Sequence, residues 1–198
     1  RSTINTLTKK VQSKPEKAQI LFRMVSFFQK KNILEIGVFC GVTARNTCDF
    51  LNKINSGKFN YTGIDLFGGN KVKLTDEIEP SFLLSQKFSN PLKNIYYNLI
   101  LKEDLNSTTS VQKLLRKYNN NVKLIEGDTN SVLKKIDLKN IDFVFLDGGH
   151  SYRTVTNDLE MLYKNLKDNK AVVLCDDYGE ESCIKEVRDA INDFVKKN

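Results

Sequence analysis

The chain has 198 residues, which is enough for one domain with a sizeable hydrophobic core. Its hydrophobic content of 40% and charged content of 28% are ordinary for a soluble globular protein. The net charge of +7 would suit a polyanionic partner, but the lysines are scattered among asparagines and form no dense basic run with interleaved aromatics. Nucleic acid is therefore not an expected partner.

The spacing of the cysteines and the length of the apolar runs indicate the cellular compartment in which the protein works. The four cysteines show neither C-x-x-C pairing nor partner histidines, so a reducing, cytoplasmic setting is favoured over zinc or a disulfide framework. No apolar run approaches the ~20 residues of a membrane span, and the N-terminus lacks a signal-peptide pattern, so no membrane partner is expected. The chain begins without methionine, which is consistent with a piece of a longer multidomain protein.

The first clear helix is predicted to begin at Ser13 and Pro15 and to end before Asn32. Serine is a good cap, proline suits the first turn, and an apolar stripe runs from Leu21 to Phe28. The twelve residues before it carry only a weak helical spacing.

Residues 32–44, NILEIGVFCGVTA, predict a buried strand, a glycine turn and a helix opening near Thr43. Gly37 would allow a tight turn, and Gly41 would allow a ligand to approach the main chain. The N–H groups of the following helix suit an anion such as a carboxylate. By itself such a turn is a weak signal, because a plain pair of turn glycines would explain it about as often.

The next predicted strand, residues 61–65, ends in an acid. Asp65 lies 24 residues after Gly41, and an acid at this place usually binds ribose hydroxyls in a βαβ nucleotide site. Leu66 and Phe67 follow and are candidates to cover a purine face.

A third predicted strand, residues 122–128, ends in Asp128 and Thr129. The 68–121 connection before it is far longer than a βαβ crossover needs. We interpret residues 69–105 as an inserted lid or substrate-recognition segment; a helical cover for the sheet edge is an equally open reading.

The stretch FVFLDGGHSY, residues 143–152, predicts a strand, a turn and a helix. Its turn carries Asp147 and His150, the only histidine of the chain. The apolar run AVVLC then delivers Asp176 and Asp177. In an open α/β sheet these side chains meet at the carboxyl edge, where ligands bind. A final amphipathic helix ends the chain.

The three strand-end motifs resemble those of class I S-adenosylmethionine-dependent methyltransferases over nearly the whole chain. ILEIGVFCGVTA is similar to their first motif, GIDL to their ribose-binding acid and EGDT to their adenine-binding turn, whereas the dinucleotide fingerprint G-x-G-x-x-G is absent. The resemblance implies a doubly wound, mostly parallel Rossmann-like α/β sheet with helices on both faces. The usual C-terminal strand pair has no evident counterpart. The implied cofactor-binding residues are Glu35, Gly37, Gly41, Thr43, Asp65, Leu66, Asp128 and Thr129.

LDGGHSY and CDDY resemble the metal-dependent O-methyltransferases, particularly the branch that methylates deoxysugars of macrolide and aminocoumarin antibiotics. The resemblance implies Mg²⁺ or Mn²⁺ at Asp147, Asp176 and Asp177, with Asp147 also part of the catalytic set. Those enzymes often carry an acid at the place of Gly149, so the role of base passes to His150. Carboxylate oxygens suit Mg²⁺, and an imidazole can accept a hydroxyl proton near neutral pH.

The predicted activity is divalent-metal-assisted O-methylation of a sugar hydroxyl, on a glycan or deoxysugar. Alternatives are a catechol-like acceptor, whose enzymes carry a lysine base at the offset of His150, or an RNA 2′-hydroxyl. A catalytically silent cofactor-binding module of a larger protein is the non-enzyme alternative. The amine-methylating motif, Asn/Asp-Pro-Pro-aromatic, is replaced by LDGG. Expected partners are the small-molecule or glycan acceptor, and a homo-oligomer or a multidomain parent chain.

Overall fold

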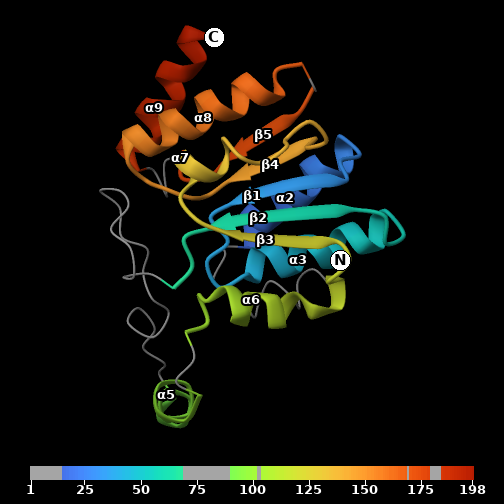
Figure 1. Ribbon diagram of the computed structural model, residues 1–198, viewed down its shortest axis with the longest axis vertical. Coiled ribbons are helices and arrows are strands. Elements are labelled where there is room, and N and C mark those ends of the chain that lie inside the picture. The colour runs from blue at the N-terminus through green and yellow to red at the C-terminus, as the bar shows by residue number, and fades with distance from the viewer. Residues whose placement is uncertain (1–14, 69–89, 102–103, 169, 179–183) are drawn as a thin grey trace.

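A single parallel sheet with helices on both faces forms the body of the protein (Figure 1). The computed structural model describes residues 15–68, 90–101, 104–168, 170–178 and 184–198. The strand order is β3-β2-β1-β4-β5, and every neighbouring pair is parallel. The chain leaves β1 in one direction to build β2 and β3, then returns to build β4 and β5 on the other side. The predicted doubly wound α/β fold is confirmed.

The elements follow the predicted order along the chain. The strands are β1 (Asn32–Ile36), β2 (Asn60–Asp65), β3 (Val122–Glu126), β4 (Phe143–Leu146) and β5 (Val172–Cys175). The α-helices are α2 (Pro15–Phe27), α3 (Val42–Ile54), α5 (Pro91–Ile95), α6 (Thr108–Leu115), α7 (Thr129–Val132), α8 (Tyr152–Leu166) and α9 (Lys185–Lys197). A π-helical turn η1 (Tyr96–Leu101) continues α5, and a 3-10 turn η2 (Arg116–Tyr118) continues α6.

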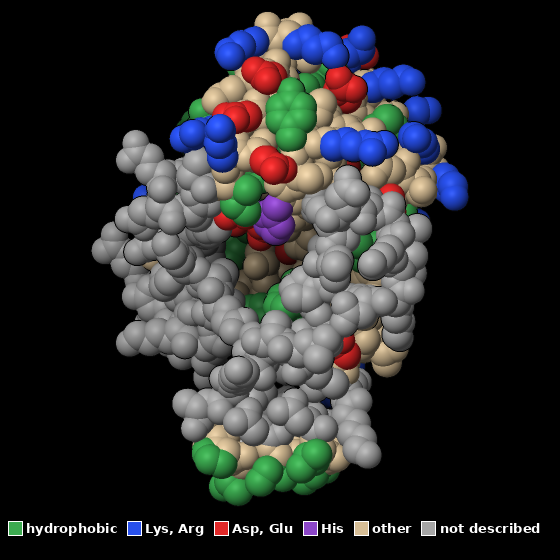
Figure 2. All heavy atoms as spheres, turned by 90° about the vertical axis from the view of Figure 1, so that its left-hand side faces the viewer, with side chains coloured by type: hydrophobic (Ala, Val, Ile, Leu, Met, Phe, Trp, Pro, Cys, Tyr) green, Lys and Arg blue, Asp and Glu red, His purple; other side chains and the backbone are tan. Residues whose placement is uncertain are grey.

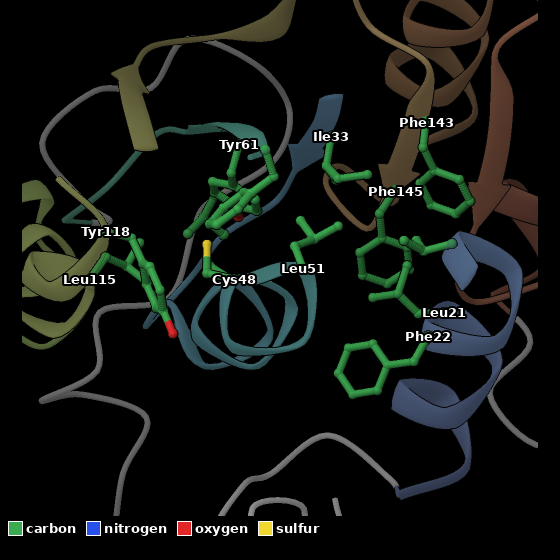
Figure 3. Close-up of a cluster of buried hydrophobic side chains, with 14 of the residues drawn as sticks. Leu21, Phe22, Ile33, Cys48, Leu51, Tyr61, Leu115, Tyr118, Phe143 and Phe145 are labelled. Carbon is green, nitrogen blue, oxygen red and sulfur yellow. The ribbon is translucent and has the colours of Figure 1, made fainter. Parts of the chain in front are cut away.

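Two hydrophobic cores lie on opposite faces of the sheet, because successive side chains of a strand alternate between its faces. On one face, α2, α3 and α6 cover Ile33 and Phe143, which are paired neighbours on β1 and β4 (Figure 3). On the other face, α7, α8 and α9 cover Leu34 and Val144, one residue further along the same two strands. Both central strands are buried on both sides, which explains their continuous apolar runs.

The predicted insertion leaves the sheet after β2 and returns before α6. Its ends are held together where the Gly68 N–H donates to the Asn106 carbonyl, and the Asn106 side chain is fully buried. Of the expected lid at 69–105, residues 69–89 and 102–103 lie outside the described residues, as does the weak helix expected in residues 1–12. The part that is described is the helical segment formed by α5 and η1.

The last element is α9, and among the described residues no strand follows β5. The one-sided exposure of β5, where Val173 is 38% exposed, follows from its place at the edge of the described sheet. Within the described ranges, no helix is both long enough and apolar enough to cross a bilayer.

Candidate active site

The carboxyl ends of the five strands lie on one edge of the sheet, and Gly37 fixes how the first of them meets its neighbour. Gly37 has a φ of +90°, and a Cβ atom placed on it would lie 1.8 Å from the carbonyl oxygen of Asp147. The Asp147 N–H donates to the Ile36 carbonyl at 2.8 Å. Only glycine permits both this φ and this close approach. The glycine turn after β1 is therefore pressed against the start of the loop that carries Asp147.

Gly41 is the N-cap of α3, with a φ of +73° and no side-chain cap. A Cβ atom at Gly41 would lie 2.7 Å from Val111 Cγ1 on α6, so helix α6 also approaches this glycine closely. Thr43 lies half-buried in the first turn of α3. Since the first backbone N–H groups of a helix have no partner within that helix, this turn still presents donors to an anion.

Asp65 ties the end of β2 to the glycine turn. Its Oδ2 accepts hydrogen bonds from the N–H groups of Val38 and Phe39, both at 2.7 Å, and its Oδ1 accepts one from Phe67 at 2.8 Å. Burial raises the pKa of this 6%-exposed carboxyl, although the three N–H donors oppose the rise. A carboxylate offers about four acceptor positions, so one remains for a ligand hydroxyl.

Of the two residues that follow Asp65, Phe67 is buried in the core and Leu66 is only half-buried. Phe67 is 3% exposed and packs in the core beneath α3 and α6, so the expectation that it covers a purine is wrong: its side chain points into the protein. Leu66 is half-buried, which leaves it as the apolar candidate next to Asp65.

Asp128 caps the short helix α7. Its Oδ1 accepts hydrogen bonds from the Asn130 backbone N–H at 3.0 Å and from Asn130 Nδ2 at 2.9 Å, while Thr129 begins the helix. The turn lies beside the end of β2, because the Gly127 N–H donates to the Asp65 carbonyl at 2.9 Å. The structure thus brings the second and third predicted motifs together.

Glu35 differs from the other predicted residues because it faces inward. It is 1% exposed, and the Tyr61 hydroxyl donates to its Oε2 at 2.6 Å, while Oε1 is buried and has no hydrogen-bond partner among the described residues. Burial raises the pKa of the Glu35 carboxyl from 4.5 to about 8, an effect that the Tyr61 hydrogen bond opposes. A pKa above neutral favours the protonated acid at pH 7, buried against Tyr61.

The loops after β4 and β5 bring His150 and the three predicted aspartates around one pocket. The pocket is lined by Asp147, His150, Asp176 and Asp177, by Gly148, Gly149 and Cys175, and by apolar residues of β4, α8 and α9. The Asp176 N–H donates to the Leu146 carbonyl at 2.9 Å, which fixes one loop against the other. Figure 2 faces this edge of the sheet, with the histidine at the surface and acidic side chains beside it.

His150 pairs with one of these aspartates. His150 Nε2 lies 3.1 Å from Asp177 Oδ2, and their side chains are 54% and 17% exposed. Asp177 has a φ of +56°, and its N–H donates to Asp176 Oδ1 at 2.8 Å. One exposed imidazole is therefore held by a more buried carboxylate, which is the arrangement that orients a general base.

A family model described as a methyltransferase domain matches residues 34–178, from the middle of β1 to the loop after β5. The chain belongs to this family. The matched region contains all the strand-end residues described above, and the predicted membership of the class I methyltransferases is confirmed. No curated protein matches the chain in sequence.

Several solved structures share the fold of this methyltransferase. The SAH-bound methyltransferase PaMTH1 of Podospora anserina is 14% identical, with a TM-score of 0.57 over 98% of this chain and 75% of that one. A Staphylococcus aureus protein described as a caffeoyl-CoA O-methyltransferase is 15% identical, with a TM-score of 0.58 over 100% and 84%. The O-methyltransferase NovP is 18% identical, with a TM-score of 0.61 over 92% and 70%.

The aspartates of this methyltransferase have the chemistry of a divalent-cation site without forming a complete one. Asp147, Asp176 and Asp177 offer carboxylate oxygens, the donors that Mg²⁺ prefers. In the part of the chain that the structure describes, no three His, Cys, Asp or Glu side chains are grouped closely enough to hold a metal ion. The residue types fit a hard cation, whereas their present arrangement includes the contact between Asp177 and His150.

The buried acid of this methyltransferase predicts a pH-dependent stability. Since Glu35 has a pKa of about 8 when folded and about 4.5 when unfolded, the folded state binds more protons between these values. The free energy of unfolding should therefore fall as pH rises from 5 to 8, by at most about 1.4 kcal/mol per pH unit. The Glu35→Gln variant cannot ionise, so urea unfolding at pH 5 and pH 8 should show a smaller loss for it than for the wild type. Equal losses in the two proteins would refute the buried-acid assignment.

Proposed function

We infer that this methyltransferase binds S-adenosylmethionine along the carboxyl ends of β1, β2 and β3. Family membership and the joining of the three motifs by Asp65 support this site. The first turn of α3 would meet the amino-acid part of the cofactor, and the remaining acceptor position of Asp65 a ribose hydroxyl. The proposed set is Glu35, Gly37, Gly41, Thr43, Asp65, Leu66, Asp128 and Thr129.

The reaction that the site supports best is transfer of the methyl group to a hydroxyl of a small sugar or glycan. The observation that carries it is the pairing of exposed His150 with Asp177 at the mouth of a pocket that contains two further aspartates. The motifs LDGGHSY and CDDY favour a sugar, and the fold is shared with proteins named as O-methyltransferases. A catechol-like acceptor is the second candidate, because one of those proteins is described as acting on caffeoyl-CoA.

In the proposed mechanism the protein positions the acceptor and removes its proton. His150 would accept the hydroxyl proton, with its imidazole held by Asp177, and S-adenosylmethionine would supply the methyl group to the acceptor oxygen. We assign Mg²⁺ or Mn²⁺ to Asp147, Asp176 and Asp177, of which the first also belongs to the catalytic set. When bound, such an ion polarises the acceptor hydroxyl and lowers its pKa.

The Asp65→Ala variant should bind S-adenosylmethionine more weakly by roughly 1–3 kcal/mol, the cost of a lost buried hydrogen bond to a ligand. Isothermal titration calorimetry measures the loss. Asp137→Ala is the matched control, because that exposed carboxylate accepts the Lys139 N–H in a turn before β4. Because Asp65 also holds three backbone N–H groups, circular dichroism must show that the variant is folded. Unchanged affinity in a folded Asp65→Ala protein would remove Asp65 from the site.

An acceptor screen tests the proposed function. The protein is incubated with S-adenosylmethionine and a deoxysugar, a catechol or an RNA oligonucleotide, with Mg²⁺ or with EDTA, and the methylated product is detected by mass spectrometry. We expect a methylated sugar that is lost with EDTA and restored by Mg²⁺. Full activity after exhaustive chelation would show that the three aspartates are not catalytic metal ligands. Cofactor binding without turnover of any acceptor would favour the silent binding module.

A further inference from the structure

Helix α9 is hydrogen-bonded to both of the loops that carry the proposed base and its partner. The Ile184 N–H, at the N-cap of α9, donates to the Asp177 carbonyl at 3.2 Å. In the first turn of α9, Glu186 Oε2 accepts the Tyr152 backbone N–H at 3.1 Å. Tyr152 is the first residue of α8 and follows closely after His150. The start of α9 therefore connects the loop after β5 to the loop after β4.

This connection acts on the outer parts of the two loops, where the sheet no longer holds them. At their base the loops are fixed by the pairing of β4 with β5. Further out, His150 Nε2 lies 3.1 Å from Asp177 Oδ2, but the histidine side chain is 54% exposed, so water competes for this contact. The hydrogen bond that Glu186 makes near His150, together with the one on the Asp177 carbonyl, restricts how far the two loops can separate.

A carboxylate is well suited to the place that Glu186 occupies. The first N–H groups of a helix have no partner within that helix. Ser151 caps α8 by accepting the Thr154 N–H, which leaves the Tyr152 N–H for an acceptor from another element. Glu186 also lies in the first turn of its own helix, so its charge is placed near the positive ends of two helix dipoles.

The same helix forms part of the pocket wall. Val187 and Ile191 of α9 and Val155 of α8 line the pocket, and all three belong to the hydrophobic core that joins the two helices. Figure 1 shows α9 beside α8, on the outer face of the sheet. The family model ends at residue 178, before α9 begins, so family membership assigns no role to this helix.

We propose that Glu186 is a positioning residue for the proposed base: it keeps His150 in reach of Asp177 by joining the start of α8 to the start of α9. The inference rests on the proposed function, in which His150 accepts the proton of the acceptor hydroxyl. A base must lie within hydrogen-bond reach of that proton, and a small displacement lowers the rate strongly. Glu186 acts through the loop that carries His150.

Substitutions at Glu186 test the proposal by kinetics. Glu186→Ala should lower kcat about tenfold or more without a change in the KM for S-adenosylmethionine. Glu186→Gln keeps an oxygen that can accept the Tyr152 N–H, so its kcat should stay within about threefold of wild type. In a His150→Ala background, Glu186→Ala should cause no further loss, because the base that it positions is already absent.

Glu160→Ala is the matched control for these substitutions. Glu160 also joins α8 to α9 through an exposed carboxylate, which lies 2.7 Å from Lys197 Nζ, but neither residue lines the pocket. Its turnover should equal that of the wild type. Circular dichroism and cofactor calorimetry on each variant show that it is folded.

A measurement without turnover separates this inference from the proposed function. His150 is the only histidine of the chain, so labelling with ¹⁵N-histidine gives NMR signals from one imidazole. In Glu186→Ala the Nε2 signal should move toward that of Asp177→Ala, in which the carboxylate partner is absent. In Glu160→Ala it should stay at the wild-type position.

Three results would overturn the proposal. They are a wild-type Nε2 signal in Glu186→Ala, an equal loss of turnover from Glu186→Ala in the wild-type and His150→Ala backgrounds, and an equal loss in Glu160→Ala. If no acceptor is methylated, the proposed function fails, whereas the NMR signal still decides whether Glu186 holds the imidazole against Asp177.

Discussion

Replacing His150 with alanine is expected to lower turnover by about 10²–10⁴-fold at neutral pH, the usual range for loss of a general base. The imidazole is more than half exposed at the mouth of the pocket, and Asp177 holds one of its nitrogens at 3.1 Å. Cofactor affinity should change little, because His150 lies after β4 whereas the proposed cofactor residues follow β1, β2 and β3. Single-turnover kinetics with saturating S-adenosylmethionine measure the effect.

The pH profile separates loss of a base from structural damage at His150. In the alanine variant the rate should recover partly as pH rises, because hydroxide or an ionised acceptor then replaces the imidazole. Tyr152→Phe is a nearby control: it removes the hydroxyl that contacts Asp193 Oδ2 at 3.1 Å and Thr156, neither of which lines the pocket, so turnover should stay within a few-fold of wild type. Wild-type turnover in His150→Ala would show that the proton leaves by another route.

The Gly37→Ala substitution is expected to cause the second large effect, on stability and on the site together. The added Cβ would lie 1.8 Å from the Asp147 carbonyl oxygen, and alanine is strained at a φ of +90°. Backbone strain and overpacking cost roughly 1–3 kcal/mol each, so the free energy of unfolding should fall by roughly 2–6 kcal/mol. The clash of the added Cβ with Asp147 can be relieved only if the glycine turn moves away from Asp147. Because this turn belongs to the proposed cofactor site, cofactor affinity should fall as well.

Gly68→Ala is the matched control for that substitution. Gly68 has a φ of +76°, but no described residue lies within 4 Å of a Cβ atom placed on it. Urea unfolding of this variant should therefore report backbone strain alone, roughly 1–2 kcal/mol. If Gly37→Ala is no more destabilising than Gly68→Ala, the close approach between the turn after β1 and Asp147 does not limit the fold.

The fold and the edge that carries the site could be predicted from sequence because both follow from local patterns. Continuous apolar runs such as FVFL predict strands buried on both faces, and helical stripes between them predict parallel crossovers. In a parallel sheet all carboxyl ends meet at one edge. That rule alone places Asp65, Asp128, Asp147 and Asp176 on the same side of the protein.

The direction and the partner of each side chain were decided by the tertiary structure. Glu35 alternates with its neighbours on β1, but which face would bury it depends on helix α3 and on Tyr61, 26 residues away. The pairing of His150 with Asp177 joins two loops 27 residues apart, and no local spacing encodes it.

The same distinction accounts for the residues whose interpretation changed. Gly41 is a turn glycine, as predicted. The packing of α6 against α3 also places a methyl group of Val111 where a Cβ atom of residue 41 would lie. Phe67 lies in the core because the backbone at the end of β2 turns its ring inward, with a φ of +38°. The sequence by itself determined the order of elements and the edge at which acids gather, since these depend on periodicity and chain direction. Contacts between distant residues required the tertiary structure, since they depend on strand register and helix packing.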